Sequence, residues 1–183
     1  IDDNYHAELL GKMNRIIPAE LVAYLKSTEC FQNFGKLFGD YFLSDEENIG
    51  REQVCFRIVR PQKEQDVGSW HKDRWFWDHY SFDTQVKAGR VKAWSQLIGE
   101  PELSGLKFMP GSHLMEIKYQ AVEQSGKLRF VPEKIRDSED SYQFSGKLGE
   151  FVLFNYDVLH VGAKNQGLDC RVSIETTFCF NED

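Results

Sequence analysis

Short β-type segments dominate the chain after residue 53. Six of them are rich in Val, Ile, Phe and Thr and are bounded by Gly, Pro, Asn or Asp. These segments are 53–60, 90–98, 105–109, 127–131, 150–155 and 171–180. Since no long helical pattern lies between them to make parallel crossovers, the sequence predicts an antiparallel sandwich or barrel rather than a doubly wound sheet.

The stretch before these segments has helical periodicity. Apolar side chains recur at helical spacing in "IPAELVAYLKS" (17–27) and "CFQNFGKLFGDYF" (30–42), and the polar stretch 44–52 indicates a loop. With 183 residues, 41% of them hydrophobic, the chain has enough apolar material for one domain. We therefore predict a single domain over 1–183, with a helical flank at 1–43 and a β core at 53–180.

Charge and cysteine content limit the partners and the compartment. Lys and Arg number 22 against 29 Asp and Glu, a net charge of −7, which argues against non-specific binding to nucleic acid. No apolar run approaches the ~20 residues that span a membrane, and no signal peptide is visible. The four cysteines form no CxxC pair and are interpreted as buried thiols in a reducing compartment, the cytoplasm, with two disulfides as the alternative.

The stretch "SWHKDRWFWDHY" (69–80) places a histidine and an aspartate two residues apart among aromatic rings. In an extended chain, residues i and i+2 point to the same side, so His71 and Asp73 could close on one metal ion. A surface ion pair is the simpler interpretation of this pair taken alone. A metal site needs a third ligand.

The remaining histidines are the candidates for that ligand, namely His6, His79, His113 and His160. His160 follows an apolar segment and a turn within "GEFVLFNYDVLHVG" (149–162). A histidine in such surroundings is more often a core residue than a ligand. The segment that follows it favours the ligand interpretation.

The segment "RVSIETTF" (171–178) alternates polar and apolar side chains, with Arg171 and Ser173 on the polar face. That face is either exposed to solvent or forms the inside of a barrel that holds a polar ligand. In the second case Arg171 lies near His160 on a neighbouring strand. Two histidines and one carboxylate on one side of an ion form the facial triad of non-haem Fe(II) oxygenases. An arginine beside them can bind a carboxylate of a co-substrate through two hydrogen bonds.

At this point the sequence resembles the phytanoyl-CoA dioxygenase family of Fe(II)/2-oxoglutarate oxygenases. The resemblance covers about residues 53 to 180, and four stretches carry it. They are "WHKD" (70–73), "VKAWSQLIGEPELSGLKFMPGSH" (91–113), "GEFVLFNYDVLHVG" (149–162) and "CRVSIETTF" (170–178). The resemblance implies a mainly β fold with flanking N-terminal helices, the double-stranded β-helix or cupin-like jelly roll.

The resemblance also implies the site and its cofactors. Its iron ligands are His71, Asp73 and His160, and its cofactors are Fe(II), the co-substrate 2-oxoglutarate and O₂. Arg171 is implied as the anchor of the distal carboxylate of 2-oxoglutarate, with Ser173 beside it. Further candidates for cofactor contacts are Trp94, Gln96 and Arg57. Arg57 could equally be a surface arginine, and His113 is expected to hold the PGSH turn rather than to line the pocket.

The predicted function is hydroxylation of a C–H bond in a small metabolite. Lys72, Arg74, Arg90 and Lys107 could place positive charge at the pocket mouth, which suits a polar or anionic substrate. The aromatic side chains of 70–80 could wall off the site or form a local core. The alternatives are a cupin-like metal enzyme that does not use 2-oxoglutarate and a non-catalytic jelly-roll binding module.

Overall fold

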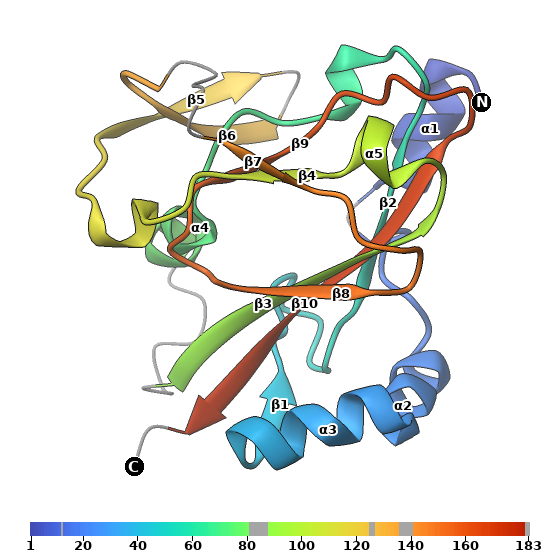
Figure 1. The fold of residues 1–183 in the computed structure, drawn as a ribbon, viewed down its shortest axis with the longest axis vertical. Helices are drawn as coiled ribbons and strands as arrows, with labels where there is room; N and C mark the ends of the chain where they lie inside the picture. The colour runs from blue at the N-terminus through green and yellow to red at the C-terminus, as the bar shows by residue number, and fades with distance from the viewer. Residues whose placement is uncertain (12, 81–87, 125–126, 136–140, 182–183) are drawn as a thin grey trace.

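Two antiparallel sheets form the main body of the computed structural model, which describes residues 1–11, 13–80, 88–124, 127–135 and 141–181 (Figure 1). The larger sheet has the order β1-β10-β3-β8, with β2 paired to the same strand β10. Its strands are β1 (Tyr41–Leu43), β2 (Cys55–Val59), β3 (Ala88–Ile98), β8 (Phe151–Asn155) and β10 (Arg171–Asn181). The smaller sheet, of order β7-β4-β9, consists of β7 (Tyr142–Phe144), β4 (Leu106–Phe108) and β9 (His160–Gly162).

The remaining elements cover this body. The hairpin β5 (Tyr119–Gln124) and β6 (Lys127–Pro132) lies beside the smaller sheet, and α2 and α3 lie below the larger one in Figure 1. The α-helices are α1 (Asp3–Leu9), α2 (Ala19–Ser27), α3 (Glu29–Phe38), α4 (Asp73–Tyr80) and α5 (Pro101–Ser104), and the 3₁₀ turns are η1 (Glu64–Asp66) and η2 (Ser112–Leu114). This mainly β architecture with N-terminal helices confirms the predicted fold class.

The alternation along β10 gives the larger sheet two different faces. Ile174 and Phe178 point outward and pack against Phe31 and Phe34 of α3, which forms the main apolar core. The opposite face carries Arg171 and Ser173, which are only 2% and 1% exposed. The polar face of this strand therefore lines the inside of the β sandwich, as the barrel interpretation predicted.

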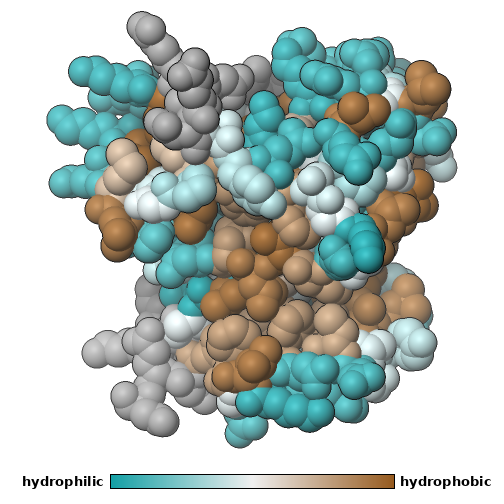
Figure 2. Space-filling view, viewed as in Figure 1, coloured by the Kyte–Doolittle hydropathy of each residue, from teal (hydrophilic) through white to brown (hydrophobic). Residues whose placement is uncertain are grey.

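The inside of the sandwich also has an apolar part. Trp94, Leu106 and Phe108 are buried there, packed against Phe154 and Val152. Figure 2 shows hydrophobic side chains gathered in the middle and lower part of one face, at the level of the larger sheet and of the space between it and α2 and α3, with hydrophilic side chains above and below.

The predicted helix at 30–42 is wrong at its C-terminal end. Helix α3 stops at Phe38, and Gly39 follows with φ of 84°, a left-handed conformation that glycine adopts without strain. Tyr41 and Phe42 then pair with Phe180 and Cys179 as strand β1. The aromatic spacing that suggested a longer helix is explained by packing, since Tyr41 contacts Phe178 from the strand.

The cysteines are all free, which agrees with the prediction of thiols, but they are not all buried. Cys55 and Cys179 are buried, whereas Cys30 is exposed. Within the described residues, we find no helix with both the length and the apolar character that a membrane span requires.

A buried ion pair attaches the N-terminal helix to the body. Arg60, with a side chain 5% exposed, binds both oxygens of Asp66 from Nε and Nη2 at 2.8 and 2.7 Å. Its Nη1 reaches Asp3 of α1 at 2.6 Å. Burial alone would raise the pKa of the Asp66 carboxyl, but hydrogen bonds from Arg60 outweigh it and hold this pKa below 3.8.

Replacing Asp66 by asparagine is expected to cost about 3 kcal/mol of unfolding free energy, because it leaves the buried Arg60 with only the exposed Asp3 as a counter-charge. Urea unfolding at pH 7 measures the loss. Lys164→Met is the control, since its pair with Glu64 is exposed and is worth under about 0.5 kcal/mol. Because the folded-state pKa is lowered, the difference between wild type and Asp66→Asn should be full above about pH 4 and shrink in stronger acid. Equal losses in the two variants would contradict the assignment.

Candidate metal centre

His71 and His160 are brought together by a short backbone bridge. The His71 N–H donates to the His160 carbonyl at 3.0 Å, and the His160 N–H donates to the His71 carbonyl at 2.9 Å. The bridge fastens the segment before α4 to β9, so the two imidazole rings lie 4.4 Å apart. The turn "PGSH" supports the approach to His160, because the buried Ser112 Oγ accepts a hydrogen bond from Leu159 N at 2.7 Å.

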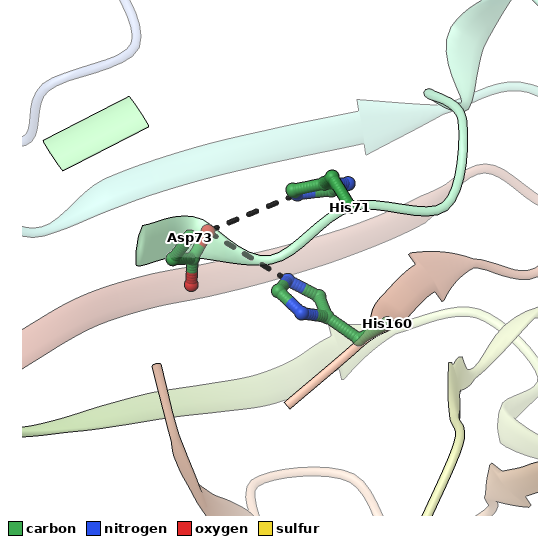
Figure 3. A group of neighbouring side chains, drawn as sticks. All are labelled: His71, Asp73 and His160. Atoms are coloured by element: carbon green, nitrogen blue, oxygen red, sulfur yellow. Dashed lines mark ion pairs between the residues drawn. The ribbon is translucent and has the colours of Figure 1, made fainter. Parts of the chain in front are cut away.

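Asp73 reaches the same point from a helix rather than from an extended strand. It is the first residue of α4, where a carboxylate also suits the positive end of the helix dipole. The predicted extended geometry therefore holds at His71 but is wrong at Asp73. The side chains converge nonetheless, as Figure 3 shows.

The three donor groups have the spacing of a metal site. One ligand atom from each of His71, Asp73 and His160 lies within 4.8 Å of the others. Asp73 Oδ1 lies 3.8 Å from His71 Nε2 and 3.7 Å from His160 Nε2. Donors bound to one ion at about 2.1 Å lie at most about 4.2 Å apart, so small side-chain shifts suffice to close on an ion. Two imidazoles and one carboxylate match the donor set of non-haem Fe(II).

Backbone carbonyls set the orientation of both rings. The Nδ1 atom of His71 lies 2.8 Å from the Ser69 carbonyl, and that of His160 lies 2.9 Å from the Val158 carbonyl. A carbonyl only accepts, so each Nδ1 carries the proton and each Nε2 keeps a lone pair for a metal. Burial, followed by the neighbouring His160, lowers the pKa of His71 to about 4, which keeps this imidazole neutral.

The second oxygen of Asp73 faces a lysine. Asp73 Oδ2 is buried and makes no hydrogen bond to the described residues, but Lys92 Nζ lies 3.8 Å from it. Burial would raise the pKa of the Asp73 carboxyl, yet Lys92 and the two histidines outweigh burial and lower it. Asp73 is therefore an anion at neutral pH. The sequence analysis missed Lys92, which lies on the same face of β3 as Trp94 and Gln96 and is buried like them.

Arg171 is anchored at one edge of its guanidinium and open at the other. Its Nη1 donates to the carbonyls of Ser104 and Gly105 at 2.7 and 3.0 Å. Its Nε is buried and, within the described ranges, has no hydrogen-bond partner. Burial is the main reason that the pKa of Arg171 falls to about 10, so the group stays charged at neutral pH.

Two further buried atoms near Arg171 lack partners in the described part of the chain. These are Ser173 Oγ, on the same face of β10, and Gln96 Oε1, on the strand position paired with Ser173. Buried polar groups are nearly always hydrogen-bonded, so a cluster of unpaired ones indicates a ligand. A charged Arg171 beside a hydroxyl fits a carboxylate such as that of 2-oxoglutarate.

The position of Arg171 relative to His160 differs from the prediction. Arg171 and His160 do not lie on neighbouring strands, because β10 belongs to the larger sheet and β9 to the smaller one. The guanidinium instead crosses the interior. A Cβ on Gly162 would lie 3.4 Å from Arg171 Nη2, and Gly162 stands two residues after His160 on β9. The guanidinium of Arg171 therefore lies beside β9, the strand that also carries His160.

Trp94 and Gln96 both lie on the inner face of β3, at 3% and 2% exposure. The Arg171 guanidinium lies 5.8 Å from the centre of the Trp94 ring, so Trp94 supports the arginine through a cation–π contact. Gln96 Nε2 donates to Ser104 Oγ at 3.2 Å, which leaves its Oε1 facing the unpaired cluster.

Arg57 lies on β2 opposite Ser173, and its side chain is 37% exposed. Its Nη2 binds Glu175 Oε1 at 3.1 Å, so it is not a freely solvated surface arginine. Burial would raise the pKa of Glu175, but Arg57, Lys92 and Arg15 outweigh it and hold this pKa far below the usual range. The inner face thus carries several charges beside the candidate metal ligands.

Three of the four basic residues expected at the pocket mouth are engaged elsewhere. Lys72 is 3% exposed and binds Asp157 at 3.0 Å, so placing it at a pocket mouth is wrong. Arg74 pairs with Asp157 and Asp78, and Arg90 stacks 4.4 Å above the Trp77 ring. Lys107 lines a cavity of about 480 Å³ together with Trp70, Leu103 and Gly162, and this lining does not include His71, Asp73 or His160.

The aromatic residues on both sides of His71 are divided between the core and the candidate site. Trp70 and Trp75 are buried with Phe130, as expected of a local core, while Tyr80 is 50% exposed. The Phe76 ring meets the His71 ring edge-on at 5.6 Å. His113 and His79 are exposed, and His6 bonds to the Ile58 carbonyl, so none of the three joins the centre.

Comparisons with known proteins agree with this geometry. The model of the family "Phytanoyl-CoA dioxygenase (PhyH)" matches residues 14–173. No curated protein sequence matches the chain significantly. The family match and the His–Asp–His group support Fe(II) and 2-oxoglutarate as the cofactors.

Solved structures show the same fold at low sequence identity. ThoJ, a non-haem monooxygenase in its apo form, is 12% identical with a TM-score of 0.64, over 97% of this chain and 64% of its own. EvdO2 from Micromonospora carbonacea var. aurantiaca, complexed with 2-oxoglutarate, is 13% identical with a TM-score of 0.62, over 90% and 65%. EctD from S. alaskensis, in its apo form, is 15% identical with a TM-score of 0.57, over 97% and 66%. The chain therefore spans just under two thirds of the length of these proteins.

Proposed function

Because this chain belongs to the phytanoyl-CoA dioxygenase family, we propose that it is a non-haem Fe(II)- and 2-oxoglutarate-dependent dioxygenase that hydroxylates a C–H bond of a small polar or anionic metabolite. The observation that carries this proposal is the convergence of His71, Asp73 and His160, with unpaired buried donors at Arg171 and Ser173. In this assignment the first three residues hold Fe(II). Arg171 and Ser173 hold the distal carboxylate of 2-oxoglutarate.

Bound iron and 2-oxoglutarate supply the oxidising chemistry, in which 2-oxoglutarate and O₂ yield succinate, CO₂ and one oxygen atom for the substrate. The side chains of the protein would bind the ion and the co-substrate, orient them and exclude water. The two Nδ1–H groups stay bonded to carbonyls, so each Nε2 is held toward the ion. The Phe76 ring meets the His71 ring edge-on and covers part of this imidazole. A carboxylate at residue 73 favours hydroxylation, because a halogenase of this type needs a small residue there for the halide.

An anionic substrate is supported by Arg129, an arginine that the sequence analysis did not consider. A Cβ on Gly68 would lie 3.2 Å from Arg129 Nη1, so this guanidinium packs against the backbone three residues before His71. Burial, followed by the charge of Arg57, lowers the pKa of Arg129. Arg57 already pairs with Glu175, so the partly buried guanidinium of Arg129 is the positive group that supports an anionic substrate.

The direct test is succinate formation with Fe(II), 2-oxoglutarate, O₂ and pooled small metabolites. We expect stimulation above the substrate-free rate by carboxylates or phosphates, and less by their neutral amides or alcohols. Equal stimulation by the neutral analogues would contradict the anionic assignment. The complete absence of succinate, with metal bound at the site, would favour the cupin-like alternative; absence of metal binding would favour the non-catalytic module.

A further inference from the structure

Lys92 is buried inside the β sandwich, next to the proposed iron ligands. Its side chain is 6% exposed, and its Nζ lies 3.8 Å from Asp73 Oδ2 and 3.3 Å from Glu46 Oε1. A lysine is almost never buried unless it is paired, since desolvation of its charge is costly. Here Asp73, Glu46 and Glu175 offset burial and raise the pKa of Lys92 well above its usual value.

The network holds Lys92 from the side away from the metal centre. Thr177 Oγ1 donates to Glu46 Oε1, and Ser44 Oγ donates to the same oxygen at 3.2 Å. Thr177 is also the residue paired with Lys92 across strands β10 and β3. Glu46 is thus fixed by two hydroxyls, and it fixes the ammonium group in turn.

The two oxygens of Asp73 face different partners. Oδ1 faces Nε2 of both histidines, whereas the buried Oδ2 faces Lys92 and has no hydrogen-bond donor in the described residues. A carboxylate without a partner on Oδ2 could rotate about its Cβ–Cγ bond, because this terminal torsion has a broad energy profile. An ion pair on one oxygen removes that freedom.

We propose that Lys92 is a positioning residue for Asp73, which holds Oδ2 so that the carboxylate presents Oδ1 alone to the metal. This inference rests on the proposed function, because it assumes that His71, Asp73 and His160 bind a metal ion. Lys92 acts on the metal only through Asp73. Its role is to order the ligand before the ion arrives.

Charge effects can be separated from this ordering effect. A positive Lys92 also repels a cation, so Lys92→Met alone changes both orientation and charge. The double variant Lys92→Met with Glu46→Gln removes one positive and one negative charge that lie 3.3 Å apart. Net charge near the ion is then unchanged, and a change in affinity reports the lost orientation.

The experiment measures the affinity of the chain for Mn(II), from the loss of the electron paramagnetic resonance signal of the free ion. Wild type, the double variant, Lys92→Arg and His71→Ala are compared, and thermal unfolding of each metal-free protein checks the fold. We expect the double variant to bind Mn(II) at least about tenfold more weakly than wild type with a similar unfolding temperature, since loss of an outer partner of a ligand costs 10–100-fold. Lys92→Arg, which keeps the cation, should stay within about threefold of wild type.

A double variant that folds and binds Mn(II) as wild type does would overturn the role of Lys92 and leave the metal site standing. Wild-type protein that binds no better than His71→Ala would overturn the proposed function together with this inference. If the double variant does not fold, Lys92→Gln in the Glu46→Gln background replaces it and is judged by the same two criteria.

Discussion

Replacing His160 by alanine is expected to weaken metal binding at least about 100-fold and to abolish succinate formation. The reason is that the side chain supplies one of three converging donors, and the loss of a direct ligand exceeds the 10–100-fold cost of losing an outer partner. Isothermal titration with Mn(II) measures the affinity. His160 is 5% exposed, so thermal unfolding of the metal-free variant is measured alongside.

His113→Ala is the matched control for this prediction. His113 is also a histidine near the smaller sheet, but it is exposed in η2 and lies outside the metal-ligand group. The His113→Ala variant should therefore bind Mn(II) as tightly as wild type does. If the two alanine variants bind alike, His160 is a core histidine rather than a ligand.

Replacing Arg171 by methionine is expected to raise the KM for 2-oxoglutarate about 100-fold, while the affinity for Mn(II) stays within about threefold of wild type. Two charge-assisted hydrogen bonds to a carboxylate are lost, a change of about 3 kcal/mol. Methionine keeps apolar contact with Trp94, over which the guanidinium lies. A rise in the KM for 2-oxoglutarate with an almost unchanged affinity for Mn(II) distinguishes an anchor of the co-substrate from a residue that only supports the fold.

Arg171→Lys tests the geometry of the same contact. Lysine keeps the charge but not the planar fork, so we expect an intermediate rise in KM of about tenfold. The unfolding temperature of both variants should fall, because the carbonyls of Ser104 and Gly105 lose their donor. A KM for 2-oxoglutarate that does not change in Arg171→Met would place the co-substrate elsewhere.

Much of the site could be predicted from the sequence because it depends on local patterns. The alternation of Arg171 and Ser173 with Val172 and Ile174 decides which side chains face inward, and a strand keeps that order wherever it is placed. His71 and His160 were chosen as candidate ligands because two histidines and a carboxylate are the residue types of a non-haem iron site, and the structure brings them together. The sequence could not decide whether this face lines an interior or is solvated. The burial of Arg171, which is 2% exposed, decides it.

The errors share a physical cause, which is contact between distant segments. Tyr41 and Phe42 continue an apolar helical pattern, and only pairing with Phe180 and Cys179 makes them a strand. Asp73 starts a helix beside the His71 bridge, and the three-residue strands β7 and β9 are too short to give a periodic signal. Lys72 looked available from its charge, yet Asp157 holds it.

Lys92 illustrates the same limit from the functional side. Its partners Glu46 and Asp73 are far from it in sequence, and they contact it only once β3 has taken its place in the larger sheet. A lysine within a β-type segment gives no local sign of being buried. The fold was therefore more predictable than the charges that surround the metal ligands.

The most direct test of the whole account is a crystal structure of the chain grown without oxygen in the presence of Fe(II) and 2-oxoglutarate. We predict one metal ion bound by His71, Asp73 and His160, and 2-oxoglutarate whose distal carboxylate contacts Arg171 and Ser173. A metal ion bound elsewhere, or 2-oxoglutarate that leaves the guanidinium of Arg171 without an anion, would contradict the account.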